Sequence, residues 1–152
     1  MKICPPADLT YIAGFVDGEG CITLVPRKKK GKCNGYFARI SIANTNLEIL
    51  TWIKSYFGGC LSLRKRRSPR HKPAWELLFS EIQAEEFVKV IMPWLRIKRR
   101  QAKVLLEYRR SVAATKHYPD RSGLSPTIRM ERDALYGKIR QLNQKGPALV
   151  TI

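Results

Sequence analysis

Apolar residues recur at intervals of three and four positions in several stretches of the chain, which is typical of helices that pack on one face. In the first stretch, Leu9, Ile12, Ala13 and Val16 form the apolar set, and Asp8 is the predicted N-cap. Further helices are expected at 46–57, 80–92, about 97–113 and 125–146.

The expected helix ends carry residues with specific backbone roles. Gly58-Gly59 ends the second helix, whose inward residues are Leu47, Leu50, Ile53 and Tyr56. The segment Ser80-Glu81-Ile82-Gln83 has the spacing of a capping box, and Pro93 stops the helix that it opens. The last helix has Ser125 as its cap, Pro126 as its first residue and Lys145-Gly146 as its stop, and its apolar stripe is Ile128, Leu135, Ile139 and Leu142.

Alternation of apolar and polar residues predicts four strands. The first two, at 21–27 and 36–44, are joined by a turn at Asn34-Gly35. The third and fourth, at 60–67 and 74–79, flank a basic loop at 68–73. The predicted order is α-β-β-α-β-β-α-α, which is an α+β fold.

The charge of the chain indicates the class of its partner. The 29 Lys and Arg residues outnumber the 12 Asp and Glu residues, giving a net charge of +17. No acidic residue lies between Glu19 and Glu48, or between Glu48 and Glu76, and the basic runs fall in these gaps. Nucleic acid is the leading partner, and an anionic membrane is the rival. No stretch approaches the ~20 apolar residues of a membrane span, and no signal-peptide core is present, so a soluble intracellular protein is expected.

The four cysteines, Cys4, Cys21, Cys33 and Cys60, form no CxxC pair. With only His71 and His117 available, the spacing does not suit a zinc finger, and reduced, structural thiols are expected.

The first helix ends in a concentration of glycine and acid. Gly14 and Gly18 are four residues apart, so they share a face that another backbone can approach closely. Asp17 and Glu19 follow at the helix end, where two carboxylates favour a cation such as a hard divalent metal.

The run Tyr-Ile-Ala-Gly-Phe-Val-Asp-Gly-Glu-Gly, from Tyr11 to Gly20, resembles the signature of the LAGLIDADG homing endonucleases. A second family motif, Pro-x-Leu-x-x-Lys-x-x-Gln, matches Pro93 to Gln101. The resemblance covers about residues 8 to 113 and contains the signature once, as in family members that act as homodimers. It implies an αββαββα core with a four-stranded antiparallel, saddle-shaped sheet over DNA. We therefore expect an endonuclease domain at 1–113 and a C-terminal helical extension at 114–152 that packs on the same domain.

The resemblance also implies site residues. Glu19 stands at the metal-binding acid, where the family more often has aspartate, and the carbonyl of Gly18 is a second ligand. Asn46 matches a polar position that orders water, although a helix N-cap is an equally good interpretation, and Lys98 stabilises charge beside the metal. Asp17 is expected to hydrogen-bond at the helix ends. The dimer interface is expected at Ile12, Ala13, Gly14, Val16 and Asp17.

The strands and loops supply the expected DNA contacts, because a two-stranded ribbon fits the major groove. Strands of about 8 residues at ~3.3 Å each, with their loops, span roughly 9 base pairs per subunit. The expected DNA-binding residues are Thr23, Val25, Arg27, Lys28, Lys29, Lys30, Lys32, Phe37, Arg39, Ser41, Ser62, Arg64, Lys65, Arg66, Arg67, Arg70, Lys72 and Glu76.

The functional hypothesis is a homodimeric, Mg²⁺-dependent endonuclease, with Mn²⁺ able to substitute, that cuts a long pseudo-palindromic DNA site. It is expected to be encoded by a mobile intron in a prokaryote or an organelle, with host intron RNA as a further candidate partner. The alternatives are an RNA-splicing maturase, a non-cleaving nucleic-acid-binding protein with the same fold, and a general basic RNA-binding protein.

Overall fold

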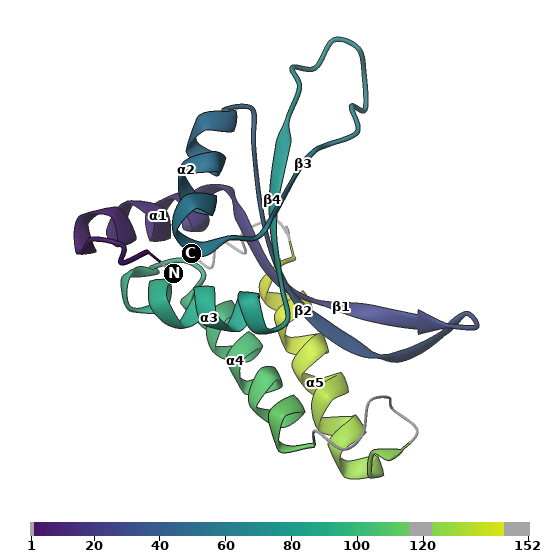
Figure 1. Ribbon diagram of the computed structural model, residues 1–152. Coiled ribbons are helices and arrows are strands. Elements are labelled where there is room, and N and C mark those ends of the chain that lie inside the picture. The colour runs from purple at the N-terminus through teal and green to yellow at the C-terminus, as the bar shows by residue number, and fades with distance from the viewer. Residues whose placement is uncertain (1, 116–122, 145–152) are drawn as a thin grey trace, which may run out of the picture.

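The computed structural model describes residues 2–115 and 123–144, and the order of their elements confirms the predicted α+β architecture (Figure 1). The elements are α1 (Pro6–Glu19), β1 (Gly20–Lys29), β2 (Lys32–Asn44), α2 (Leu47–Phe57), β3 (Cys60–Leu63), β4 (Trp75–Ser80), α3 (Ile82–Ile91), the 3-10 helix η1 (Met92–Trp94), α4 (Arg99–Ala114) and α5 (Pro126–Leu142). The predicted Lys145-Gly146 stop lies outside the described residues.

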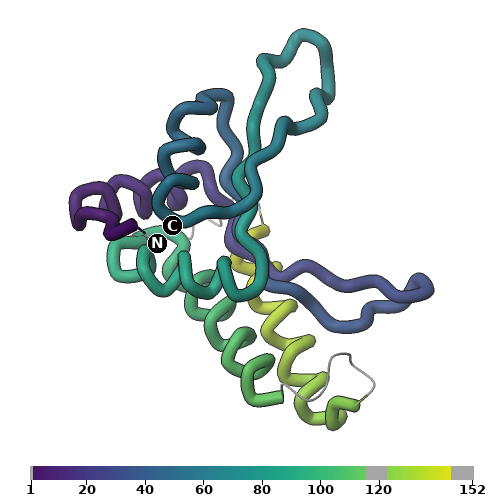
Figure 2. Tube along the Cα trace, viewed as in Figure 1, coloured from purple at the N-terminus to yellow at the C-terminus, as the bar shows by residue number. Residues whose placement is uncertain are grey.

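The four strands form one antiparallel sheet in the order β1-β2-β4-β3. The two hairpins meet only where residues 39–44 of β2 pair with residues 75–80 of β4. Beyond this junction each hairpin continues alone, and Figure 2 shows their tips pointing in different directions. The sheet therefore has a shared centre and two projecting arms.

One face of the sheet packs against helices and forms the core. The strand residues on this face are buried, and they are Ile22, Leu24, Tyr36, Ala38, Ile40, Ile42, Leu77 and Phe79. Phe79 stacks on Phe87 of α3 at 4.3 Å between ring centroids. Because side chains alternate along a strand, the intervening residues are carried on the opposite face. We call this second face the open face.

The turn of the first hairpin differs from the prediction. Lys30 and Gly31 form it, with φ of 50° and 76°, and Lys29 pairs with Lys32. A two-residue hairpin turn with two positive φ angles has the twist that flanking strands require. The predicted turn residue Gly35 lies inside β2 with φ of 93°, at the bulge where the register shifts between Pro26 and Lys28.

Four smaller expectations are also wrong. Pro5 precedes the first helix, and Asp8 lies in its first turn, where it accepts a hydrogen bond from the Tyr56 hydroxyl at 2.9 Å. Ser80 belongs to β4, so there is no capping box, and the residue before α3 is Glu81 with φ of 53°. Leu47 is exposed, because it starts α2 at the edge of the core, and β3 ends at Leu63 rather than at residue 67.

The last helix, α5, begins as predicted: Ser125 accepts from the Ile128 N–H at 3.3 Å and Pro126 is the first residue. It packs against α4 and against the hairpin of β1 and β2 (Figure 1). Tyr36 of β2 stacks on Tyr136 at 4.6 Å between centroids and donates to Asp133 Oδ1 at 2.6 Å. Burial and this hydrogen bond raise the pKa of Tyr36. The boundary predicted at 113/114 remains a prediction.

Among the described residues, no helix is long and apolar enough to cross a membrane.

Candidate functional site

The C-terminal end of α1 is held in place by Asp17. Its Oδ2 accepts from the backbone N–H groups of Arg96 and Ile97 at 2.7 and 3.1 Å, and its Oδ1 accepts from that of Lys98 at 2.9 Å. Burial raises the pKa of Asp17, but the three backbone donors and the Lys98 ammonium outweigh it and bring the pKa below its usual value. The predicted hydrogen-bonding role of Asp17 is confirmed.

Lys98 reaches the same helix end from the segment before α4. Its Nζ donates to the backbone carbonyl of Asp17, so the ammonium lies at the negative end of the α1 dipole. The side chain is half-buried. The lysine of the second motif is therefore placed next to the last two residues of α1.

Glu19 and Gly18, these last two residues, are exposed. The carbonyl of Gly18 is among the last carbonyls of the helix, which have no partner inside it. A carboxylate oxygen and a backbone carbonyl are hard ligands that suit Mg²⁺ or Ca²⁺. In the described part of the chain, no three His, Cys, Asp or Glu side chains gather in a way that could hold a metal, so Glu19 belongs to no such cluster.

Asn46 does not belong to this group. It caps α2, accepting from the Ile49 N–H at 3.2 Å, which confirms the alternative interpretation of this residue and not the water-ordering one. The second strand ends two residues earlier, at Asn44, whose Oδ1 accepts from the Asn46 N–H at 2.8 Å. The polar residue at the end of β2 is thus Asn44, and the expected role of Asn46 in ordering water stays a prediction.

The predicted dimer face of α1 needs correction. Ile12, Ala13 and Val16 are fully buried in the core of the single chain, and Asp17 is 8% exposed and bound to the segment before α4. Only Gly14 of the predicted set is exposed. The uncovered face of α1 carries Ala7, Tyr11, Gly14 and Gly18 instead. Apolar periodicity identifies a face that is buried, but it does not say which partner buries it.

The open face of the sheet carries most of the predicted strand contacts. Thr23, Val25, Phe37, Arg39, Ser41, Ser62 and Glu76 alternate with core residues, and none of them is buried. The register places Thr23 beside Arg39 and Ser62 beside Glu76. The open face is therefore a polar surface with a few apolar side chains, supported from behind by the core.

Arg27, which is expected to contact DNA, makes contacts within the chain that were not expected. Its Nε donates to the Tyr36 carbonyl at 3.1 Å, and its guanidinium pairs with Glu81. Glu81 also accepts from Arg109 Nη1 at 2.7 Å, and Arg109 Nε reaches Glu85 at 3.1 Å. These ion pairs link the first hairpin to α3 and α4. No local pattern in the sequence indicates this network, because its members lie up to 82 positions apart.

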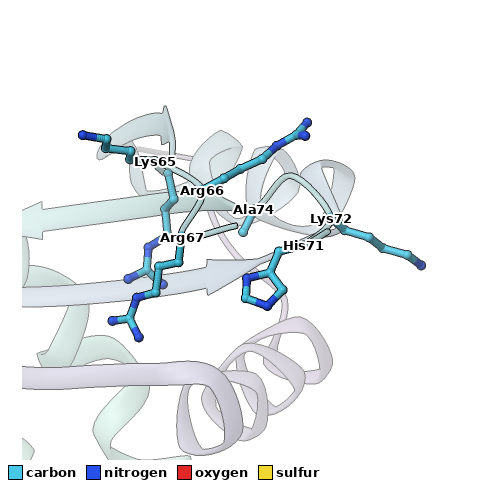
Figure 3. Close-up of a pocket in the computed structure, with 7 residues that line it drawn as sticks. Lys65, Arg66, Arg67, His71, Lys72 and Ala74 are labelled. Carbon is cyan, nitrogen blue, oxygen red and sulfur yellow. The ribbon is translucent and has the colours of Figure 1, made fainter. Parts of the chain in front are cut away.

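Apart from Arg27 and Arg39, the basic residues among the predicted DNA contacts lie at the outer ends of the two hairpins. Lys28, Lys29, Lys30 and Lys32 are exposed around the turn of the first hairpin. The segment between β3 and β4 encloses a hollow of about 340 Å³ lined by Arg64, Lys65, Arg66, Arg67, His71, Lys72 and Ala74, and Figure 3 shows their side chains spread around it. Such exposed positive surfaces suit a polyanion.

Comparison with known proteins agrees with this geometry. The model of the family described as LAGLIDADG endonuclease matches residues 12–108, which is more than half of the chain. The chain belongs to the LAGLIDADG family. It is 26% identical over 133 residues to DNA endonuclease I-CvuI of Chlorella vulgaris, covering 85% of this chain and 75% of I-CvuI.

Solved structures of LAGLIDADG proteins confirm the fold. The crystal structure of the homing endonuclease I-CvuI in complex with its target in the presence of Ca has a TM-score of 0.72, with 24% identity, over 93% of this chain and 85% of I-CvuI. The archaeal intron-encoded homing endonuclease I-Vdi141I complexed with DNA has a TM-score of 0.70, with 18% identity, over 91% and 85%. The structure of I-SmaMI bound to cleaved DNA has a TM-score of 0.71 with 16% identity, and 95% of this chain covers 48% of I-SmaMI.

Proposed function

We propose that this protein is a site-specific, double-strand DNA homing endonuclease that works as a homodimer. One observation carries the proposal: Glu19 and Lys98 lie at the same exposed end of α1. β1 starts at this point and leads into the sheet, whose open face is polar. Family membership supports phosphodiester hydrolysis, and I-CvuI and I-Vdi141I are known in complexes with DNA.

The donor set at the end of α1 fits a hard divalent cation such as Mg²⁺. Glu19 offers a carboxylate and Gly18 a carbonyl, while water, DNA phosphate and the second subunit would complete the shell. When bound, such an ion lowers the pKa of a coordinated water and stabilises charge on a departing oxygen. The presence of Ca or Mg in the I-CvuI complexes supports a divalent ion in the family.

The chain's own residues prepare this chemistry. Asp17 fixes the segment 96–98, which in turn holds the Lys98 ammonium at the helix end. From this position Lys98 can offset the negative charge that develops on a phosphate in attack. The fixed cation needs no rearrangement during the reaction, which makes it effective.

The homodimer follows from the incomplete site and from the uncovered face of α1. One chain contributes one Glu19, whereas cutting both strands of a duplex requires two such groups. A face with Tyr11, Gly14 and Gly18 lets a second helix approach closely around a two-fold axis. The target would then be a long sequence with approximate two-fold symmetry.

The decisive experiment is a plasmid cleavage assay with Mg²⁺ on the intron-less insertion site. Glu19→Gln keeps the size of the side chain and removes the charge that would bind the metal, so cutting should fall below detection while DNA binding is retained. The matched control is Glu107→Gln, which removes an exposed carboxylate from α4. Equal cutting by both variants would contradict the assignment of Glu19.

Two further observations bear on the proposal. Binding without cutting by the wild-type protein would favour a maturase or a regulator with the same fold. An open reading frame inside an intron, in a prokaryotic or organellar genome, would support the mobile-element origin that we propose.

A further inference from the structure

We infer that Arg39 and Glu76 together read one G·C base pair in each half of the DNA target, with Arg39 on guanine and Glu76 on cytosine. This inference rests on the proposed function and adds the base pair that the enzyme recognises. It is carried by the position, the free hydrogen-bonding capacity and the opposite charges of the two side chains.

Both residues lie on the open face of the two inner strands, β2 and β4. Arg39 Nη2 and Glu76 Oε1 are 3.8 Å apart, which is an ion pair but is too long for a hydrogen bond. Within residues 2–115 and 123–144, neither side chain makes a hydrogen bond, although both are partly buried. Their donors and acceptors are therefore available to a ligand on the open face.

The contrast with Arg27 shows why Arg39 is the candidate. The guanidinium of Arg27 is occupied by Glu81 and by the Tyr36 carbonyl, so it serves the protein's own structure. Arg39 lies on the neighbouring strand, opposite Thr23, and its ion-pair partner Glu76 is too far away for a hydrogen bond. A guanidinium that remains available in the middle of a binding face is suited to a bidentate contact.

The carboxylate of Glu76 beside Arg39 indicates that Arg39 binds the edge of a DNA base and not the DNA phosphate backbone. Glu76 is the one acidic residue on the open face of the four described strands, amid a strongly basic protein. A carboxylate repels phosphate, so it would weaken a backbone contact by its neighbour. In the major groove, however, guanine offers the acceptors O6 and N7 to arginine, and cytosine offers an N4 donor to a carboxylate.

The location also favours the inner part of each half-site. Lys98, Arg39 and Glu76 are the charged groups around the thiol of Cys21, which lies two residues after Glu19. The reading pair thus lies close to the proposed catalytic end, whereas the lysines and arginines of the hairpin ends lie farther out.

The test is a selection from a pool of randomised DNA duplexes, followed by affinity measurements on the selected duplex and on all its single-base-pair variants. The wild-type protein should require G·C at one position of each half-site. In Arg39→Lys, which keeps the charge but loses the planar fork, that preference should fall by about 5- to 150-fold at this position alone. Glu76→Gln should weaken preference at the same base pair.

The matched control is Arg66→Ala, in the basic segment between β3 and β4. It should lower affinity for all duplexes alike and reduce the slope of log affinity against log salt by about 0.9. Arg39→Ala should leave that slope nearly unchanged. Thermal unfolding of each variant checks that the fold is intact.

The outcomes separate the inference from the function beneath it. If the wild-type protein selects a site and the Arg39 variants keep its full preference profile, or behave like Arg66→Ala, the base-reading role is wrong while the endonuclease remains. If the wild-type protein selects no duplex sequence at all, the proposed function fails and the inference fails with it.

Discussion

Asp17 connects the signature helix to the segment that carries Lys98, and it does so with a single carboxylate. Three backbone N–H groups and one ammonium from residues 96–98 converge on this residue. At the level of individual residues, the geometry of the candidate site therefore depends on a group that does not itself face the DNA.

Replacing Asp17 with alanine should lower the free energy of unfolding by about 3 kcal/mol, because three partly buried backbone donors lose a charged acceptor. Urea denaturation at neutral pH measures this loss. Glu107→Ala, which removes an exposed carboxylate, provides the control and should change stability by less than about 0.5 kcal/mol.

The same residue predicts an acid sensitivity. Because the pKa of Asp17 is lower in the folded protein than its ordinary value, its contribution is complete above the ordinary pKa of about 4. The contribution is lost as the pH falls through the lowered pKa. The difference in unfolding free energy between wild type and Asp17→Ala should accordingly be constant from pH 7 to 5 and shrink below about pH 4. A difference that grew on acidification would contradict the assignment.

At the scale of elements, several side-chain contacts fix the first hairpin to the helices. Tyr36 contacts α5, and the Arg27–Glu81–Arg109 network reaches α3 and α4. The two arginines of this network differ in burial, since the Arg109 side chain is 10% exposed and that of Arg27 is 53% exposed.

Arg109→Ala should destabilise the protein by about 2 kcal/mol or more, because it removes the buried cation shared by Glu81 and Glu85 and leaves them only the exposed partners Arg27 and Lys89. Arg27→Ala should cost less than about 1 kcal/mol, since an exposed ion pair contributes little. Chemical denaturation of the two variants under identical conditions makes the comparison. Equal losses would contradict the larger contribution assigned to the buried Arg109.

The elements themselves could be predicted from the sequence, because local pattern specifies them. Gly58-Gly59, Ser125 and Pro126 end or start helices through backbone effects that act within a few residues. The sequence predicts the turn at Asn34-Gly35, because Asn-Gly is the stronger local signal. In the structure the turn lies at Lys30-Gly31, and Gly35 lies at the bulge instead.

The candidate site was predictable where a motif supplied it and not where distant residues meet. Glu19 and Lys98 belong to two separate motifs, and the fold brings these two motifs together. The commitment of Arg27 to Glu81 arises only in three dimensions, as does the inward orientation of Ile12 and Val16. Hydrophobic periodicity in the sequence predicts neither of these two features.

For the whole molecule, the uncovered face of α1 allows a clean test of assembly. A Cβ added at Gly14 would meet no atom within 4 Å in the single chain. Gly14→Leu should consequently leave the monomer folded and separate the proposed dimer. Analytical ultracentrifugation measures the mass, and circular dichroism confirms the fold. A variant that sediments as a normal dimer would count against pairing through this face.

The charge of the whole molecule predicts a steep salt dependence of DNA affinity. Each phosphate contact contributes about −0.9 to the slope of log affinity against log salt. The double variant Lys28→Gln/Lys30→Gln, at the exposed end of the first hairpin, should reduce the magnitude of that slope by about 1.8. Fluorescence anisotropy from low to physiological salt provides the measurement, and an unchanged slope would place these lysines away from the DNA.

The anchoring of the first hairpin has a mechanical consequence. Beyond the shared centre of the sheet, the outer part of this hairpin is a lever, so a small rotation at its base would swing its tip through a wide arc. Tyr36 and the Arg27–Glu81 pair hold the hairpin beyond this shared centre, so they oppose such a rotation. The outer part of the first hairpin is therefore already restrained in the free protein. The conformational entropy that this restraint costs is not lost again when a duplex binds.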